Sequence, residues 1–217
     1  MISDRLAAIA YMVDKNKVVF DVGSDHGLLP IFLVESGICP KAYAGDNKLG
    51  PLETAKKNIE SAKLTDKVIP VYADGLPQNI NDMDIVTIAG MGYYTIEHIL
   101  DNADISQYQY LIIQTNSDVE LLRKYISDHL YTIEDERIIF DDFYYQIIKF
   151  SADMHDPYSD LEIKYGPILL KKRDHIFLNY LKDKKDKLID INNKANKDIY
   201  KDTIEEIEMI LNHEGDE

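Results

Sequence analysis

A glycine-containing turn interrupts an apolar stretch near the start of the chain. Residues 18–22 have the pattern of a buried strand, Gly23 follows at once, and residues 28–34 form the apolar beginning of a helix. Such a loop directs backbone N–H groups and a positive helix end at a ligand. In the dinucleotide-binding spacing G-x-G-x-x-G, however, Asp25 stands where the second glycine belongs. Its carboxylate would repel a pyrophosphate and suits a ligand with positive charge, such as the amino group and sulfonium of S-adenosylmethionine.

Acidic residues follow the next two expected strands. Asp46 ends the run 41–46, about 20 residues beyond the glycine loop, where nucleotide-binding α/β folds carry the carboxylate for the ribose hydroxyls. Asp74 and Gly75 follow the run 68–73. Together the three positions would serve the methionine, ribose and adenine of one cofactor. The predicted cofactor-binding residues are Asp21, Gly23, Ser24, Asp25, Asp46, Asn47, Asp74 and Gly75.

A third group of candidates would frame the acceptor. Residues 89–92 read Ala-Gly-Met-Gly after the fourth expected strand, where methyltransferases acting on amino groups or ring nitrogens hold their acceptor. Small residues there let a flat base approach, although the same sequence is also a simple turn into a helix. His26 is a candidate proton acceptor, stacking surface or helix-start residue. The candidate positioning residues, with no certain acid or base among them, are His26, Ala89, Gly90, Met91, Gly92 and Asn116.

These candidates need a sheet to bring them together. Strand-type runs at 18–22, 41–46, 68–73, 84–89 and 110–113 alternate with helical patterns, and a short helix is expected within residues 3–15. The alternation favours a doubly wound, largely parallel sheet. Runs 131–140 and 143–150 are so closely joined that they must form an antiparallel hairpin. The expected fold is therefore an α/β, Rossmann-like sheet of the class I methyltransferase type, with the hairpin at its C-terminal end.

The pattern changes after residue 151. Apolar residues at three-four spacing over 177–195, and again over 200–211, predict two antiparallel helices in a coiled-coil-like pair. We therefore expect a catalytic domain that binds S-adenosylmethionine over residues 1–152 and a C-terminal helical hairpin over residues 153–217. Two narrow helices cannot make a globular core, so the pair must lean on the first domain or reach a partner.

Composition limits the partners. The formal charge of −15 over 217 residues argues against generic nucleic-acid binding. Residues 164–187 are the exception, with eight basic and three acidic side chains, which form either a solvated helix face or a phosphate-contacting patch. Cys39 is the single cysteine, the histidines lack metal-ligand spacing, and the sequence has no apolar run of membrane length. A cytoplasmic protein with no metal site and no membrane contact is expected.

The motifs together resemble those of a known family, the bacterial TrmK-type tRNA (adenine-22-N1)-methyltransferases. The specific signatures are Ser24-Asp25-His26 after the first glycine and Ala-Gly-Met-Gly at 89–92. The similarity extends over essentially the whole chain and includes Arg5-Leu6, Leu29-Pro30, Asp46, Gly50-Pro51-Leu52, Asp74-Gly75-Leu76, Asn116 and Leu122-Arg123. The chain departs from the family pattern at Gly27-Leu28, Tyr93 and Thr115, where the family usually has Ala-Tyr, a second glycine and a proline.

The resemblance implies methyl transfer from S-adenosylmethionine to N1 of an adenine in the D-arm of tRNA. Because an acidic protein must still hold RNA, we expect a basic rim made of Arg5, Arg123 and the segment with Lys171, Lys172 and Arg173. Two other classes stay open. One is a methyltransferase for a small molecule, and the other is a non-catalytic adaptor that binds S-adenosylmethionine and uses its C-terminal helices to contact a partner.

Overall fold

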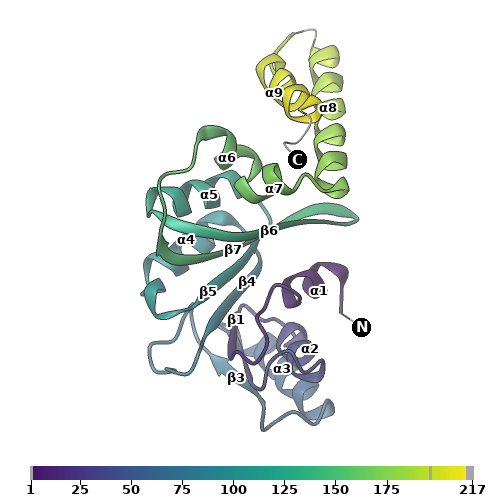
Figure 1. The fold of residues 1–217 in the computed structure, drawn as a ribbon. Helices are drawn as coiled ribbons and strands as arrows, with labels where there is room; N and C mark the ends of the chain where they lie inside the picture. Colours follow the sequence, from purple (N-terminus) through teal and green to yellow (C-terminus); the bar gives the residue numbers. More distant parts are fainter. Residues whose placement is uncertain (1, 196, 214–217) are drawn as a thin grey trace.

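The computed structural model describes residues 2–195 and 197–213, and it is built around one seven-stranded sheet (Figure 1). The strands are β1 (Val19–Val22), β2 (Ala42–Asp46), β3 (Val68–Tyr72), β4 (Ile85–Met91), β5 (Tyr110–Thr115), β6 (Tyr131–Asp141) and β7 (Phe143–Met154). Their order across the sheet is β3-β2-β1-β4-β5-β7-β6. The first five strands pair in parallel, and β7 runs antiparallel to both β5 and β6. The predicted α/β fold with its closing hairpin is therefore confirmed.

Helices cover both faces of the sheet because successive strand residues point to opposite sides. On one face, α1 (Asp4–Ala10), α2 (Leu28–Glu35) and α3 (Leu49–Ser61) pack over strand residues such as Val19 and Ile85. On the other face, α4 (Tyr93–Asp101) and α5 (Val119–Asp128) pack over their neighbours Phe20 and Val86. A short 3₁₀ turn, η1 (Ile105–Gln107), precedes β5. Both faces are buried, which explains why the central strands are almost continuously apolar.

The boundaries of several elements differ from the predicted ones. The first helix ends at Ala10, ahead of the polar turn in which Asn16 adopts a φ of +63°. The fourth strand continues to Met91 through an irregularity between Ala89 and Met91, where Gly90 has a φ of +78°. The first three residues of the motif expected after this strand therefore form its end, and Gly92 follows as the N-cap of α4.

The C-terminal helices pack against the end of the sheet nearest β6. Helices α8 (His175–Ala195) and α9 (Lys201–Asn212) form the predicted pair, and two short helices that we did not expect, α6 (Asp160–Tyr165) and α7 (Pro167–Lys172), precede them. Phe177, Leu181 and Ile207 form an apolar cluster with Ile138 of β6. Strand β7 runs to Met154, two residues beyond the boundary proposed at 152. In the part of the chain that the structure describes, every helix is too short or too polar to cross a membrane.

A buried ion pair joins the sheet to these helices. The Arg123 side chain of α5 is fully buried, and its Nε donates to Oε1 of Glu136 in β6 at 2.7 Å. Oε2 of the same carboxylate accepts from the backbone N–H of Ile168 in α7 at 2.9 Å. A Cβ at Gly166 would lie 2.6 Å from that carboxylate, so only glycine fits there. The prediction that Arg123 contacts RNA is therefore wrong, because its guanidinium is enclosed by protein.

Removal of either partner of this pair should strongly destabilise the fold. Arg123→Ala or Glu136→Ala leaves one charge buried without its counter-ion, which costs about 3–5 kcal/mol. We expect a much lower urea midpoint for each single variant and a partial recovery in the double variant Arg123→Leu/Glu136→Leu. Lys124→Ala, which breaks the neighbouring exposed pair with Asp128, is the matched control and should change the midpoint little. Equal effects of the Arg123 and Lys124 substitutions would contradict this account.

Candidate functional site

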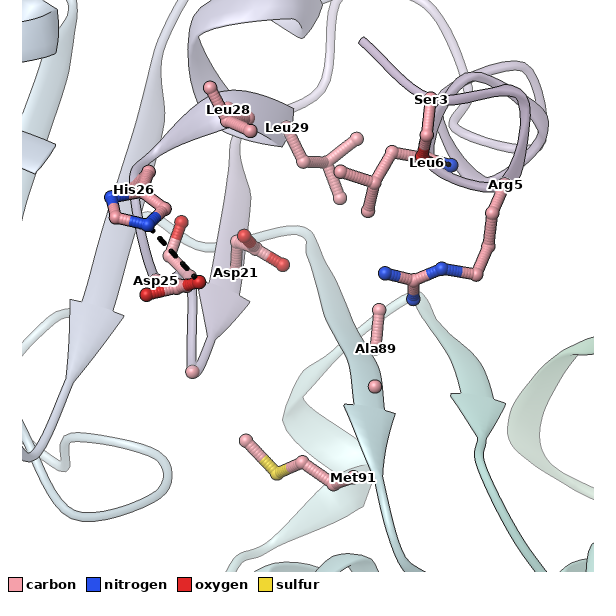
Figure 2. A pocket seen from close by; sticks show the side chains of 13 residues that line it. Ser3, Arg5, Leu6, Asp21, Asp25, His26, Leu28, Leu29, Ala89 and Met91 are labelled. Carbon is pink, nitrogen blue, oxygen red and sulfur yellow. Dashed lines mark hydrogen bonds and ion pairs between the residues drawn. The ribbon is translucent and has the colours of Figure 1, made fainter. Parts of the chain in front are cut away.

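A cavity of about 530 Å³ opens at the carboxyl ends of β1 and β4, beside α1 (Figure 2). This is the edge of the sheet where ligands bind in doubly wound folds. Nine of the predicted site residues line it together, with Arg5 reaching toward Ala89 from α1. The lining residues are Ser3, Arg5, Leu6, Asp21, Gly23, Ser24, Asp25, His26, Leu28, Leu29, Ala89, Gly90 and Met91.

The glycine loop forms one wall of the cavity. Gly23 has a φ of +66°, a conformation that L side chains rarely adopt, and a Cβ there would lie 2.1 Å from Cε of Met91. Ser24 donates its backbone N–H to the carbonyl of Gly45 at 2.8 Å, which ties the loop to β2. Gly27, at a φ of +70°, then begins α2, so the glycine that departs from the family pattern fits this backbone.

Asp21 lies at the base of the cavity with an unusual carboxyl group. Its side chain is almost fully buried, and Oδ1 accepts a hydrogen bond from the Thr87 hydroxyl of β4 at 2.7 Å. Burial raises the pKa of Asp21 to about 6, although the nearby Ser24 and Thr87 hydroxyls and the charge of Arg5 partly oppose the shift. The cavity therefore holds a carboxyl group that changes charge just below neutral pH.

The other acidic candidates form a row along the same edge. Oδ2 of Asp46 accepts from the backbone N–H of Asp25 at 3.3 Å, and its Oδ1 accepts from that of Lys48 at 2.8 Å. Asn47 donates to the Asp74 carboxylate at 2.8 Å. Asp74 and Gly75 line a neighbouring hollow of about 250 Å³ that also includes His98 and Asn102. The glycine loop and the two strand ends are therefore connected by hydrogen bonds, in the order that the sequence predicted.

On the opposite wall, the buried side-chain amide of Gln114 organises the candidate acceptor site. Its Oε1 accepts from Nη1 of Arg5 at 2.5 Å and from the Gly90 N–H at 3.2 Å. Its Nε2 donates to the Thr115 carbonyl at 2.7 Å and to Oδ1 of Asn116 at 3.1 Å. Asn116 in turn donates to the Gly90 carbonyl at 2.7 Å. Arg5 and Gly90, which line the cavity, are thus held in fixed positions, and Asn116, which does not line it, is bonded to the backbone of Gly90.

Of the two remaining candidates, His26 lines the cavity and Gly92 does not. The His26 ring is half-exposed, and its Nε2 lies 3.6 Å from Oδ2 of Asp25. Gly92 caps α4, and the Tyr93 that follows it is buried in the core, where its hydroxyl donates to Glu97 at 2.5 Å. Tyr93, which stands where the family usually has a second glycine, is therefore enclosed by the protein and is not available to stack on a base.

The basic residues of α7 lie away from this cavity. Lys171 is exposed, and Lys172 forms an ion pair with Asp135. Arg173, at a φ of +49°, lines an apolar groove with Leu161 and Met209. Neutralisation by Asp135 lowers the positive charge that Lys172 can offer to a phosphate.

Two features of the cavity fit S-adenosylmethionine. The Ser24 hydroxyl is buried but has no hydrogen-bond partner among the described residues, so it is free to bond a polar ligand group. Gly23 lines the cavity without a side chain, which exposes its backbone to a ligand, and the carboxylates of Asp21 and Asp25 suit a cationic ligand. No cluster of metal-ligating side chains occurs within residues 2–195 and 197–213.

Sequence reasoning missed Gln114 and Thr87 as site residues. Each is a buried polar residue that follows an apolar run within its strand: Thr87 follows Ile85-Val86 in β4, and Gln114 follows Ile112-Ile113 in β5. A buried polar side chain requires a hydrogen-bond partner. The presence of these polar residues in apolar strands was therefore the available signal, because it indicates hydrogen bonds to side chains on other elements.

Comparisons with known proteins agree with this geometry. The profile of a family described as a methyltransferase domain matches residues 2–148. The tRNA (adenine(22)-N(1))-methyltransferase of Bacillus subtilis is 30% identical over 186 residues, which are 82% of this chain and 78% of that protein.

Solved structures give the same result. The TrmK of M. capricolum, in complex with S-adenosyl-homocysteine, shares 32% identity over 98% of this chain and 95% of that one, with a TM-score of 0.79. A Streptococcus pneumoniae protein in complex with S-adenosyl-L-methionine shares 31% identity over 97% of this chain and 100% of that one, with a TM-score of 0.87. The chain therefore belongs to the TrmK-type tRNA (adenine(22)-N(1))-methyltransferase family, as its motifs predicted.

Proposed function

We propose that this protein transfers the methyl group of S-adenosylmethionine to N1 of adenine 22 in the D-arm of tRNA. The observation that carries the proposal is the cavity in which the glycine loop faces Arg5 and Gly90, the two lining residues that Gln114 holds in position. Its family membership and the cofactor complexes of related structures support the same activity. The proposal includes a cytoplasmic location.

The cofactor half of the site is assigned to the row of strand ends. S-adenosylmethionine supplies an electrophilic methyl group on a sulfonium. Asp21 and Asp25 would stabilise its positive charges, with Gly23 allowing close approach to the backbone. Asp46 would accept hydrogen bonds from the ribose hydroxyls, and Asp74 with Gly75 would border the adenine.

The acceptor half needs precise positioning more than it needs a base. N1 of neutral adenine carries a lone pair, so it attacks without prior deprotonation, and most of the rate enhancement comes from alignment and exclusion of water. Gly90 and Ala89 give a flat base room, while Asn116 and Arg5 are held by Gln114 at fixed positions. Because N1 lies on the pairing edge, the adenine must leave its stack, at a cost of a few kcal/mol.

The activity is tested with radiolabelled S-adenosylmethionine and unmodified tRNA, followed by mapping of the modified nucleotide. We expect label at N1 of adenine 22. Asn116→Ala should bind cofactor normally but methylate much more slowly. Asn81→Ala, at an exposed position before β4 and at the opposite end of that strand from the cavity, is the control and should bind tRNA and turn over normally. Cofactor binding without label in RNA would overturn the proposal and favour a small-molecule methyltransferase or a non-catalytic adaptor.

Cofactor affinity should depend on pH through Asp21. Because the pKa of Asp21 is raised to about 6, the free protein holds this carboxyl increasingly protonated below pH 6. A cationic ligand favours the ionised form, so binding should weaken about tenfold per pH unit below pH 6 and level off above pH 7. Titration calorimetry should show proton release near pH 6.

Two variants separate the contribution of Asp21 from that of the neighbouring His26. Asp21→Asn should bind more weakly at pH 7 and lose most of the dependence, because the amide does not titrate. His26→Asn should keep the dependence. A profile that follows His26 instead of Asp21 would contradict the assignment.

The basic segment on α7 is proposed to contact tRNA phosphates. Charge reversal of Lys171, Lys172 and Arg173 together should weaken tRNA binding. The slope of log K against log salt concentration should become shallower by about two to three. Reversal of Lys57, Lys63 and Lys67, in and after α3, changes the net charge equally and is the control. Filter binding over a range of salt concentrations measures both effects, and equal losses in the two variants would eliminate a specific role for α7.

A further inference from the structure

The β6–β7 hairpin extends beyond the sheet that supports it. Strand β7 pairs with β5 only over residues 147–150, whereas β6 and β7 stay paired out to Asp141 and Phe143. The end of the hairpin, residues 140–146, therefore projects as a two-stranded arm past the carboxyl end of β5 and above α1 (Figure 1). This is the edge of the sheet on which the cavity opens.

Two phenylalanine rings at the end of this arm face solvent. Phe140 is 59% exposed and Phe143 is 70% exposed, on either side of the turn Asp141-Asp142. The register pairs Phe140 with Tyr144 and Asp141 with Phe143, so each face of the arm presents one exposed ring. Exposing large apolar rings is unfavourable in water, and exposed apolar patches commonly mark interaction sites. Phe140 contacts Tyr144 edge to face, at 5.0 Å between ring centroids.

The arm is held from both sides. On one side, the Tyr144 hydroxyl donates to Asp183 of α8 at 2.8 Å. On the other side, the Arg5 guanidinium lies 5.6 Å from the centre of the Tyr145 ring, and the Arg5 backbone N–H donates to Asp141 at 3.4 Å. The two exposed rings are therefore presented in a fixed position, which lowers the entropy cost of binding a partner.

Arg5 connects this arm to the cavity. The same side chain lines the cavity and donates to Gln114. Under the proposed function, on which this inference rests, the cavity receives an adenine extruded from the tRNA. The nucleotides attached to that adenine must then lie near the mouth of the cavity, within reach of the arm.

The chemistry of the arm favours bases over phosphates. Asp141 and Asp142 would repel a phosphate backbone or an anionic membrane, and they disfavour a second copy of a chain that carries a charge of −15. Aromatic rings bind bases by stacking, which needs no positive charge, and a carboxylate can accept from exocyclic amino groups. We propose that Phe140 and Phe143 stack on the tRNA bases that flank the target adenine.

A fluorescent variant tests the contact directly. The sequence contains no tryptophan, so Phe143→Trp introduces a single reporter at the end of the arm. We expect unmodified tRNA to quench its emission in a saturable manner, at the concentration where filter binding shows complex formation. Tyr11→Trp, exposed at the far end of α1, is the matched control and should not respond. Filter binding without a change at Phe143→Trp would overturn the proposal.

Loss of the rings should affect RNA and not cofactor. Phe140→Ala/Phe143→Ala should raise the Kd for tRNA on the order of tenfold or more, with unchanged affinity for S-adenosylmethionine and an unchanged Tm. Phe140→Tyr/Phe143→Tyr keeps both rings and should bind tRNA as the natural protein does. Unchanged tRNA affinity in the alanine variant, with N1 of adenine 22 still methylated, would refute the role of the arm and leave the proposed function standing. Absence of methylation by the natural protein would refute that function itself.

Discussion

The parallel pairing of β1 with β4 is the constraint on which the site depends. From β1 the chain proceeds outward through β2 and β3, and it then returns to place β4 and β5 on the other side. Connections that leave in opposite directions from two adjacent strands open a crevice at their carboxyl ends. The Thr87 hydroxyl and the Asp21 carboxylate bridge this junction at 2.7 Å. The glycine loop and the acceptor residues meet because these two strands are neighbours.

Most of the fold and the cofactor side of the site were predictable because they follow local rules. Apolar strand patterns and the residues at strand ends are continuous in the sequence, so Asp46 and Asp74 could be assigned to one edge before any contact was known. Arg123 was misassigned for the opposite reason. Its burial depends on Glu136 and Gly166, which lie on other elements, and nothing in its local sequence indicates that such partners exist.

The acceptor wall was only partly predictable. Arg5 was expected at a basic rim, but it lies in the cavity because Gln114 accepts its hydrogen bond from a strand 109 residues away in sequence. The cost of leaving a buried amide without partners is what fixes this arrangement. Arg5 contacts the cavity, Gln114 and the hairpin at once, so its position depends on three elements that meet only in the folded protein.

The carboxylate of Glu136 also bears on how the protein can be divided. Its two oxygens are shared between Arg123 in α5 and the first N–H groups of α7, and Gly166 covers it. A fragment that stops at the end of the sheet would keep both charges but lose the backbone donors and the cover, which would admit water to the pair. The sheet and the C-terminal helices therefore share the buried Arg123–Glu136 pair. We expect them to unfold together, as one cooperative unit.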